Sequence, residues 1–254
     1  MPDATLHTSP LHQWHLDAGA TMAEFGGWSM PMDYAGAGVL AEHGAVRQAV
    51  GLFDVSHLGK LLVTGPGAVD YLNTRLTNDL RRLAPGRAQY TLLCNAAGGV
   101  VDDMIAYLIS AEQVLLVPNA ANAATVAELL KAGAPNEVQV ADLGHDLAII
   151  AVQGPRCDEL LAAAGLPIDL AYMAFTDAGG QATVCRSGYT GERGYELVVP
   201  AGQASAWWTR LLQAGADMGV RACGLGARDT LRTEMGYALH GNDLSPEIDP
   251  VSAR

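Results

Sequence analysis

Apolar residues alternate with polar or small residues along several short stretches of the chain, which is the pattern of β-strands with one buried face. The clearest case covers residues 195–199, where Glu196 and Val198 fall on one face and three apolar residues fall on the other. In other stretches the apolar residues recur at helical spacing instead. That spacing predicts helices over about residues 36–50, 120–131 and 227–235.

Two parts of the chain share one order of elements. Residues 60–72 and 147–161 each consist of an apolar strand, a Gly-Pro pair and an amphipathic helix, with the proline expected at the first helical position. A β-hairpin follows each, with a glycine-rich turn at residues 96–99 or 178–180, and leads to a strand that carries an acid. We therefore predict an α+β fold of two related modules, each a mostly antiparallel sheet with flanking helices, and a ligand cleft where they meet.

The length of 254 residues, of which 50% are hydrophobic, is sufficient for more than one compact unit. The order of the elements predicts a discontinuous first module of residues 1–53 and 143–254. The second module of residues 54–142 is then inserted into the first.

The composition of the chain limits the cellular environment and the classes of binding partner that are expected. A formal net charge of −12 disfavours nucleic acid, because binding to phosphates needs a basic face. No apolar run approaches the length of a membrane span, and the first residues lack a secretion signal, so a cytoplasmic protein without membrane contact is expected. The cysteines are scattered without a close pair, which suits a reducing compartment: Cys94, Cys157, Cys185 and Cys223.

Glu196 is the most informative single residue, because it lies inside an otherwise apolar strand and should point where Val198 points. A covered carboxylate needs hydrogen-bond donors. An arginine could supply them, and so could a ligand with two parallel N–H groups, such as the edge of a pterin. A structural ion pair is the alternative for an isolated strand glutamate.

Asp102 and Asp103 follow the first glycine-rich turn and are adjacent in the expected strand. Their side chains should therefore point to opposite faces and cannot share a proton. At most one of them is expected in a cleft, while the other faces solvent or holds the turn.

Arg228 lies in the first turn of its expected helix, where a cation is unfavourable beside the positive end of the helix dipole. An ion pair with Asp229, Glu234 or Glu196 would offset that cost, and a ligand is the other explanation. The pair of His12 and His15 has metal-ligand spacing without a nearby third ligand, and no metal site is predicted.

Five motifs follow one another along nearly the whole chain, at residues 25–31, 53–59, 95–103, 188–192 and 224–229. Together they are similar to the motifs of the aminomethyltransferase of the glycine cleavage system, the T-protein. Departures are small: Gly26 and Ser29 replace the usual alanine and glutamate, and Leu58 replaces the usual methionine.

The resemblance implies a transferase that moves an aminomethyl group from the dihydrolipoyl arm of a small carrier, the H-protein, to tetrahydrofolate. The products would be 5,10-methylenetetrahydrofolate, ammonia and the reduced arm. Tetrahydrofolate is a substrate in this reaction, and no metal is implied. The first module would be the folate-binding module.

The resemblance also assigns site residues in a central folate cleft. Glu196 matches the glutamate that holds the pterin edge, with Arg228 nearby. Asp103, in preference to Asp102, matches the aspartate at the reacting amines. Further pocket positions are Tyr90, Tyr189 and Asn119.

The chain stops where T-proteins usually continue into a third, β-rich domain, so a fragment, a split gene product or a shortened chain is expected. Three alternatives stay open. They are another folate-dependent demethylase or the folate domain of a sarcosine or dimethylglycine oxidase, a regulatory relative that assists iron–sulfur assembly, and a folate-binding chain without turnover. The regulatory relatives typically carry a cysteine in a segment that here reads Ser187 to Gly191 and has none.

Overall fold

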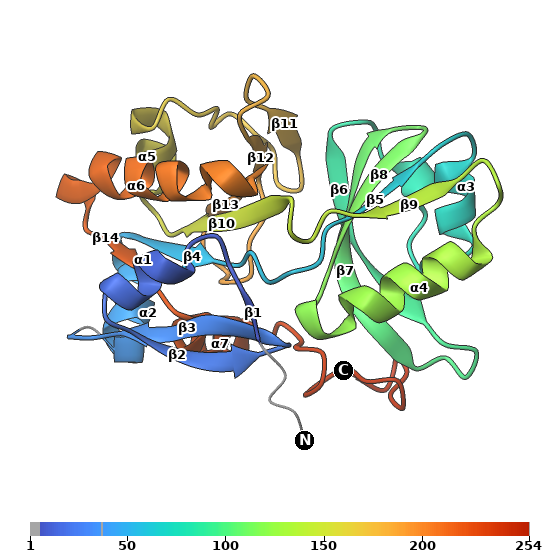
Figure 1. Cartoon of the computed structure of the whole chain (residues 1–254), viewed down its shortest axis with the longest axis horizontal. Helices are drawn as coiled ribbons and strands as arrows, with labels where there is room; N and C mark the ends of the chain where they lie inside the picture. The colour runs from blue at the N-terminus through green and yellow to red at the C-terminus, as the bar shows by residue number, and fades with distance from the viewer. Residues whose placement is uncertain (1–5, 37, 254) are drawn as a thin grey trace. The chain divides into compact units, whose positions relative to one another are not determined.

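The structure is a computed structural model, and it describes residues 6–36 and 38–253 (Figure 1). The chain folds into two compact units. Unit 1 combines the residues up to His57 with His145–Tyr172 and Thr176–Tyr237. Unit 2 combines Leu58–Gly144 with Met173–Phe175 and the residues from Ala238 onward. The mixture of helices and sheets predicted from the sequence pattern is confirmed.

Unit 1 is built on a six-stranded sheet of order β11-β12-β13-β10-β4-β14. The pairs β12–β13, β13–β10 and β10–β4 are antiparallel, and β14 joins parallel to β4. Helices α5 and α6 contribute Leu160, Trp208 and Leu211 to the buried core over one face of this sheet. The strands are β4 (Val50–Asp54), β10 (Leu147–Gln153), β11 (Phe175–Asp177), β12 (Thr183–Cys185), β13 (Gly194–Pro200) and β14 (Val220–Ala222).

A smaller three-stranded sheet, of order β1-β3-β2, belongs to the same unit. Its strands are β1 (His7–Thr8), β2 (Ala20–Phe25) and β3 (Trp28–Tyr34). The helices of unit 1 are α1 (His12–Asp17), α2 (Gly38–Gln48), α5 (Cys157–Ala163), α6 (Ala204–Ala214) and α7 (Leu225–Glu234), with short 3₁₀ turns at Ala201–Gln203 and Ala216–Met218.

Unit 2 has a five-stranded sheet of order β6-β7-β8-β5-β9, in which every neighbouring pair is antiparallel. The strands are β5 (Leu61–Thr64), β6 (Arg87–Cys94), β7 (Val100–Ser110), β8 (Gln113–Pro118) and β9 (Gln139–Asp142). The helices are α3 (Ala68–Asn73) and α4 (Ala123–Gly133), with 3₁₀ turns at Leu80–Arg82 and Ala120–Asn122. No described helix is both long and apolar enough to cross a membrane.

The two larger sheets share their central connectivity. In each sheet the strand that precedes the Gly-Pro pair lies beside the strand that leads through a 3₁₀ turn into an 11-residue helix: β5 beside β8, and β10 beside β13. The duplicated order of elements is therefore confirmed. The prolines lie earlier than predicted, because the helices begin at Ala68 and Cys157, two residues after Pro66 and Pro155.

The acids of the two halves do not lie in corresponding strands, contrary to expectation. Glu196 lies on β13, whose counterpart by sheet order is β8, whereas Asp102 and Asp103 lie on β7, whose counterpart is β12. The reason is that β12 ends at Cys185 and a loop intervenes, so Glu196 falls one strand further along the chain than a simple repeat would place it.

The last part of the chain also differs from the expected domain boundary, which placed it in the first module. It packs against the β6–β7 turn of unit 2, where the backbone N–H of Val100 donates to the carbonyls of Ser245 and Ile248 at 2.9 and 3.1 Å. A Cβ added at Gly99 would lie 1.8 Å from the carbonyl oxygen of Pro246, so this close approach requires glycine.

Candidate functional site

Strand β13 places Glu196 as its alternation predicts. Tyr195, Leu197 and Val199 are fully buried in the core of unit 1, so Glu196 points to the opposite face of the sheet. Its side chain is part-buried, and its Oε2 accepts a hydrogen bond of 2.5 Å from the Ser187 hydroxyl. Within the described part of the chain, Glu196 thus accepts a hydrogen bond from a neutral donor, and a carboxylate can accept several more.

Arg228 does not form the ion pairs that its neighbours in sequence suggested. Asp229 pairs with Arg232 at 2.8 Å, and Glu234 pairs with Arg47 at 2.7 Å. Burial lowers the pKa of Arg228, and the negative charge of Glu196 opposes that shift. The Nη1 atom of Arg228 is enclosed and has no hydrogen-bond partner among the described residues, so the guanidinium carries a buried donor that a ligand acceptor could satisfy.

The guanidinium of Arg228 lies over one tyrosine ring, which stacks on a second. The Cζ atom of Arg228 lies 4.5 Å from the ring centroid of Tyr189, and the rings of Tyr189 and Tyr237 stack with centroids 5.8 Å apart. Cation–π contact of this kind stabilises a charged group away from water. We call Ser187, Tyr189, Glu196, Arg228 and Tyr237 the Arg228 cluster.

A cavity of about 210 Å³ borders this cluster. Ser187 and Tyr237 line it together with Arg186 and Gly188. Tyr189, Glu196 and Arg228 are not among its lining residues, so this cavity lies beside the cluster and is not enclosed by it.

The loop of residues 186–193, which we call the Tyr189 loop, is fixed by the buried side chain of Gln153 on β10. Gln153 Nε2 donates to the carbonyls of Ser187 and Tyr195, and Gln153 Oε1 accepts from the Thr190 hydroxyl at 2.8 Å. A Cβ at Gly188 would lie only 2.1 Å from Gln153 Oε1. The glycine thus lets the loop close over the glutamine.

In unit 2, Asp102 on β7 is completely buried. This differs from the expectation that the aspartate outside the cleft faces solvent or holds the glycine-rich turn. It accepts hydrogen bonds from the backbone and side-chain N–H groups of Asn119, both at 2.9 Å, and from Asn122 Nδ2 at 2.7 Å. Burial raises the pKa of Asp102 to about 6, against the effect of these three donors. The prediction failed because alternation alone does not show which strand faces are covered. Asp102 therefore links β7 to the residues that directly precede α4.

Asp103 is part-buried and accepts a hydrogen bond on each of its two carboxylate oxygens. Tyr90 Oη donates to its Oδ2 at 3.0 Å, and Asn119 Nδ2 donates to its Oδ1 at 2.9 Å. Burial raises the pKa of Asp103, while the hydrogen bonds from Tyr90 and Asn119 and the electrostatic interaction with His240 oppose the rise. A carboxylate with a raised pKa is better able to accept a proton near neutral pH.

His240 forms hydrogen bonds next to the same group of residues. Its Nε2 donates to the Val100 carbonyl at 3.0 Å, and its Nδ1 accepts from Asn122 at 3.0 Å. We call Tyr90, Asp102, Asp103, Asn119, Asn122 and His240 the Asp103 cluster. Every predicted site residue therefore belongs to one of two clusters, each within one unit.

In the histidine pair with metal-ligand spacing, His15 has protein partners on its ring nitrogens. His15 is buried and uses both ring nitrogens, with Asp54 at 2.9 Å and Tyr34 at 2.8 Å. Gly224, the first residue of the motif at residues 224–229, has a packing role, since a Cβ at this position would lie 2.2 Å from the backbone of Met32.

Sequence reasoning missed five residues of these clusters and of their support. Ser187 directly precedes the Gly-Tyr-Thr-Gly motif, and Asn122 follows Asn119 at one helical turn, so local spacing could have identified both. The others lie in segments without periodicity or act on residues remote in the sequence: Gln153, Tyr237 and His240.

Comparison with known proteins agrees with this architecture. Residues 11–254 match the family model of the GCVT N-terminal domain. The aminomethyltransferase of Frankia alni is 61% identical over 99% of this chain and 70% of its own length, and that of Mycobacterium avium is 54% identical over 99% and 69%. The crystal structure of glycine cleavage system aminomethyltransferase T from Bartonella henselae superposes with a TM-score of 0.92 at 40% identity, over 97% of this chain and 67% of that one.

The chain therefore belongs to the aminomethyltransferase family of the glycine cleavage system, and it spans about two thirds of the length of the relatives that it matches. A chain of heterotetrameric sarcosine oxidase from Corynebacterium sp. U-96 shares the fold at a TM-score of 0.51 and 16% identity. The similarity at this low identity concerns the fold alone.

Proposed function

We propose that this chain binds tetrahydrofolate and transfers to it the aminomethyl carbon carried by the dihydrolipoyl arm of the glycine cleavage H-protein. The observation that carries the proposal is the enclosed Nη1 of Arg228, which has no hydrogen-bond partner in the described ranges 6–36 and 38–253. The Arg228 guanidinium lies over the ring of Tyr189 and within the electrostatic influence of Glu196. A pterin has a flat ring for the tyrosines, N–H groups for a carboxylate and a carbonyl for a guanidinium.

In this proposal each cluster has one task. The Arg228 cluster binds the pterin, with Glu196 on its amino-pyrimidinone edge. Asp103 orients the reacting amine, stabilises the positive charge that develops on it and takes up or relays its proton, as its raised pKa favours. Tyr90 and Asn119 hold the two oxygens of Asp103.

The chemistry replaces two bonds of the transferred carbon. The bonds from this carbon to the carrier sulfur and to the amino group break, and two bonds to folate nitrogens form. The amino group leaves as ammonia, and the sulfur returns to the reduced arm as a thiol. Electrons balance without an added oxidant or reductant, so the protein contributes position and charge stabilisation.

Calorimetry with tetrahydrofolate tests the binding step. Glu196→Ala removes a charged acceptor, and we expect the dissociation constant to rise by about 30-fold, or about 2 kcal/mol. The matched control is Glu159→Ala, which removes an exposed glutamate paired with Arg156. Equal affinity in Glu196→Ala and the parent would refute the assignment of Glu196. Ammonia release from aminomethylated H-protein then tests turnover.

A further inference from the structure

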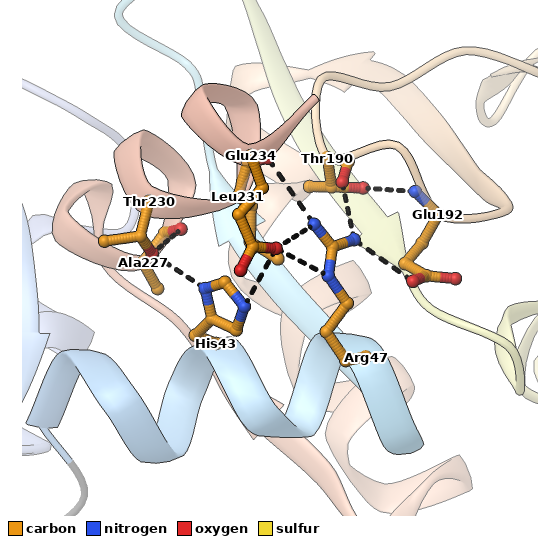
Figure 2. A network of polar contacts seen from close by, with 8 residues as sticks. All are labelled: His43, Arg47, Thr190, Glu192, Ala227, Thr230, Leu231 and Glu234. Carbon is orange, nitrogen blue, oxygen red and sulfur yellow. Dashed lines mark hydrogen bonds and ion pairs between the residues drawn. The ribbon is translucent and has the colours of Figure 1, made fainter. Parts of the chain in front are cut away.

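Arg47, near the end of α2, makes five hydrogen bonds, one for each N–H that a guanidinium can offer (Figure 2). Its Nη1 donates to the Thr190 carbonyl at 2.7 Å and to Glu192 Oε1 at 3.1 Å. Its Nη2 donates to Glu234 Oε2 at 2.7 Å and to the Leu231 carbonyl at 3.5 Å, and its Nε donates to Glu234 Oε2 at 3.2 Å.

These bonds connect two elements that are distant in the sequence. Thr190 and Glu192 belong to the Tyr189 loop, whereas Leu231 and Glu234 belong to the last turns of α7. Figure 2 shows the guanidinium of Arg47 lying between them, with both carboxylates turned toward it. Arg47 therefore fixes the separation of the loop from the helix.

That separation matters because the contact between Tyr189 and Arg228 spans it. Tyr189 is the residue directly before Thr190 in the loop, and Arg228 lies on α7, so each belongs to one of the two joined elements. Their 4.5 Å contact depends on the same loop-to-helix placement that Arg47 sets.

Further contacts make this arrangement stiff. His43, one helical turn before Arg47 on α2, lies 3.3 Å from Glu234 Oε2 and bonds to the Thr230 hydroxyl at 2.8 Å. On the other side of the loop, Gln153 holds Thr190 by its hydroxyl. Thr190 is thus bound through its carbonyl by Arg47 and through its hydroxyl by Gln153, and little freedom remains for Tyr189.

We propose that Arg47 is a positioning residue for the pterin site: it holds Tyr189 and Arg228 in their stacked arrangement before the ligand arrives. This inference rests on the proposed function for its effect on binding. The planar, five-donor guanidinium is essential to the role, because a lysine at this place keeps the charge but has only three donors on one nitrogen and cannot span Thr190 and Glu234 at once.

Two measurements on the whole chain test the proposal, with Arg47→Met and Arg47→Lys compared with the parent. Amide hydrogen exchange of peptides that cover residues 186–193 reports the mobility of the Tyr189 loop without any ligand. Calorimetry with tetrahydrofolate reports the consequence for binding. Arg156→Met is the matched control, because Arg156 forms a comparable ion pair with Glu159 that is exposed and joins residues of one helix end.

We expect both Arg47 variants to exchange faster in residues 186–193 and to bind tetrahydrofolate about tenfold more weakly, a change that corresponds to about 1.4 kcal/mol. Exchange in the five-stranded sheet of unit 2 should stay as in the parent, which separates a local effect from a general loss of folding. Parental affinity in Arg47→Met, or parental exchange of the loop, would overturn the proposal. If the parent itself does not bind tetrahydrofolate, the proposed function fails, and loop exchange alone then decides whether Arg47 positions Tyr189.

Discussion

Replacement of Asp102 by asparagine should change how the stability of the protein depends on pH. In the folded chain Asp102 is completely buried and its pKa is raised to about 6, from an ordinary value of 3.8. The folded state therefore binds a proton more tightly than the unfolded state. For a carboxyl group with a raised pKa, stability is highest at low pH and falls as the pH rises toward the folded pKa.

The size of this effect follows from the shift. A shift of about two pKa units corresponds to about 3 kcal/mol in the free energy of unfolding. This contribution is complete at pH values below the unfolded pKa and is lost entirely at pH values above the folded pKa. Between pH 5 and pH 7.5 the loss from Asp102 alone is about 1.4 kcal/mol. Asparagine is neutral at every pH and resembles the protonated acid, so it should remove this contribution.

The assay compares the free energy of urea unfolding of Asp102→Asn and of the parent at pH 5 and pH 7.5. Far-UV circular dichroism is the appropriate probe, because Trp14, Trp28, Trp207 and Trp208 all lie in unit 1 and tryptophan fluorescence would not follow Asp102. Low protein concentration is needed at pH 5, close to the sequence pI of 4.8.

Relative to the parent, the variant should gain about 1.4 kcal/mol as the pH rises from 5 to 7.5. The exposed Asp70→Asn serves as the control in the same unit and should show no such gain. A difference between Asp102→Asn and the parent that is the same at both pH values would refute the reasoning. It would mean that the bonds from Asn119 and Asn122 fully offset the cost of burial.

Two further substitutions test separate parts of the structure. Asp103→Asn should lower the rate of ammonia release by about 100-fold while tetrahydrofolate affinity changes little, because the proton acceptor is lost and the pterin contacts stay. Single-turnover kinetics measures the rate and calorimetry measures the affinity. Equal turnover in the variant and the parent would refute this role of Asp103. Gly99→Ala should loosen the final segment of the chain, since its Cβ would clash with the Pro246 carbonyl, and limited proteolysis after Ala238 should become faster. Unchanged cleavage would show that the segment is not held at that turn.

Local features of the site could be predicted from the sequence. The alternation around Glu196 correctly separated its face from the core face of β13, because the period of a strand is independent of the rest of the fold. The helix that carries Arg228 and the glycine-rich turn before Asp102 also lie where the pattern predicts them.

The choice among possible partners could not be predicted. Arg228 has acidic neighbours on its own helix, yet Asp229 forms its ion pair with Arg232. Glu234 forms its ion pair with Arg47, which is remote in the sequence. Alternation likewise placed Asp102 and Asp103 on opposite faces without showing that Asn119 would contact both. Such selection depends on tertiary packing, which has no signature in residue spacing.

The insertion of unit 2 into unit 1 has a consequence for the order of events during synthesis. Strand β4 leaves the ribosome early, and all of its residues are buried in the finished protein, yet its partner β10 emerges only after the sheet of unit 2 has been made. Until then β4 exposes an unpaired apolar edge, of the kind on which nascent chains aggregate or recruit chaperones. The strands of the inserted sheet are close together in the sequence, so this sheet can fold before β10 is available to pair with β4.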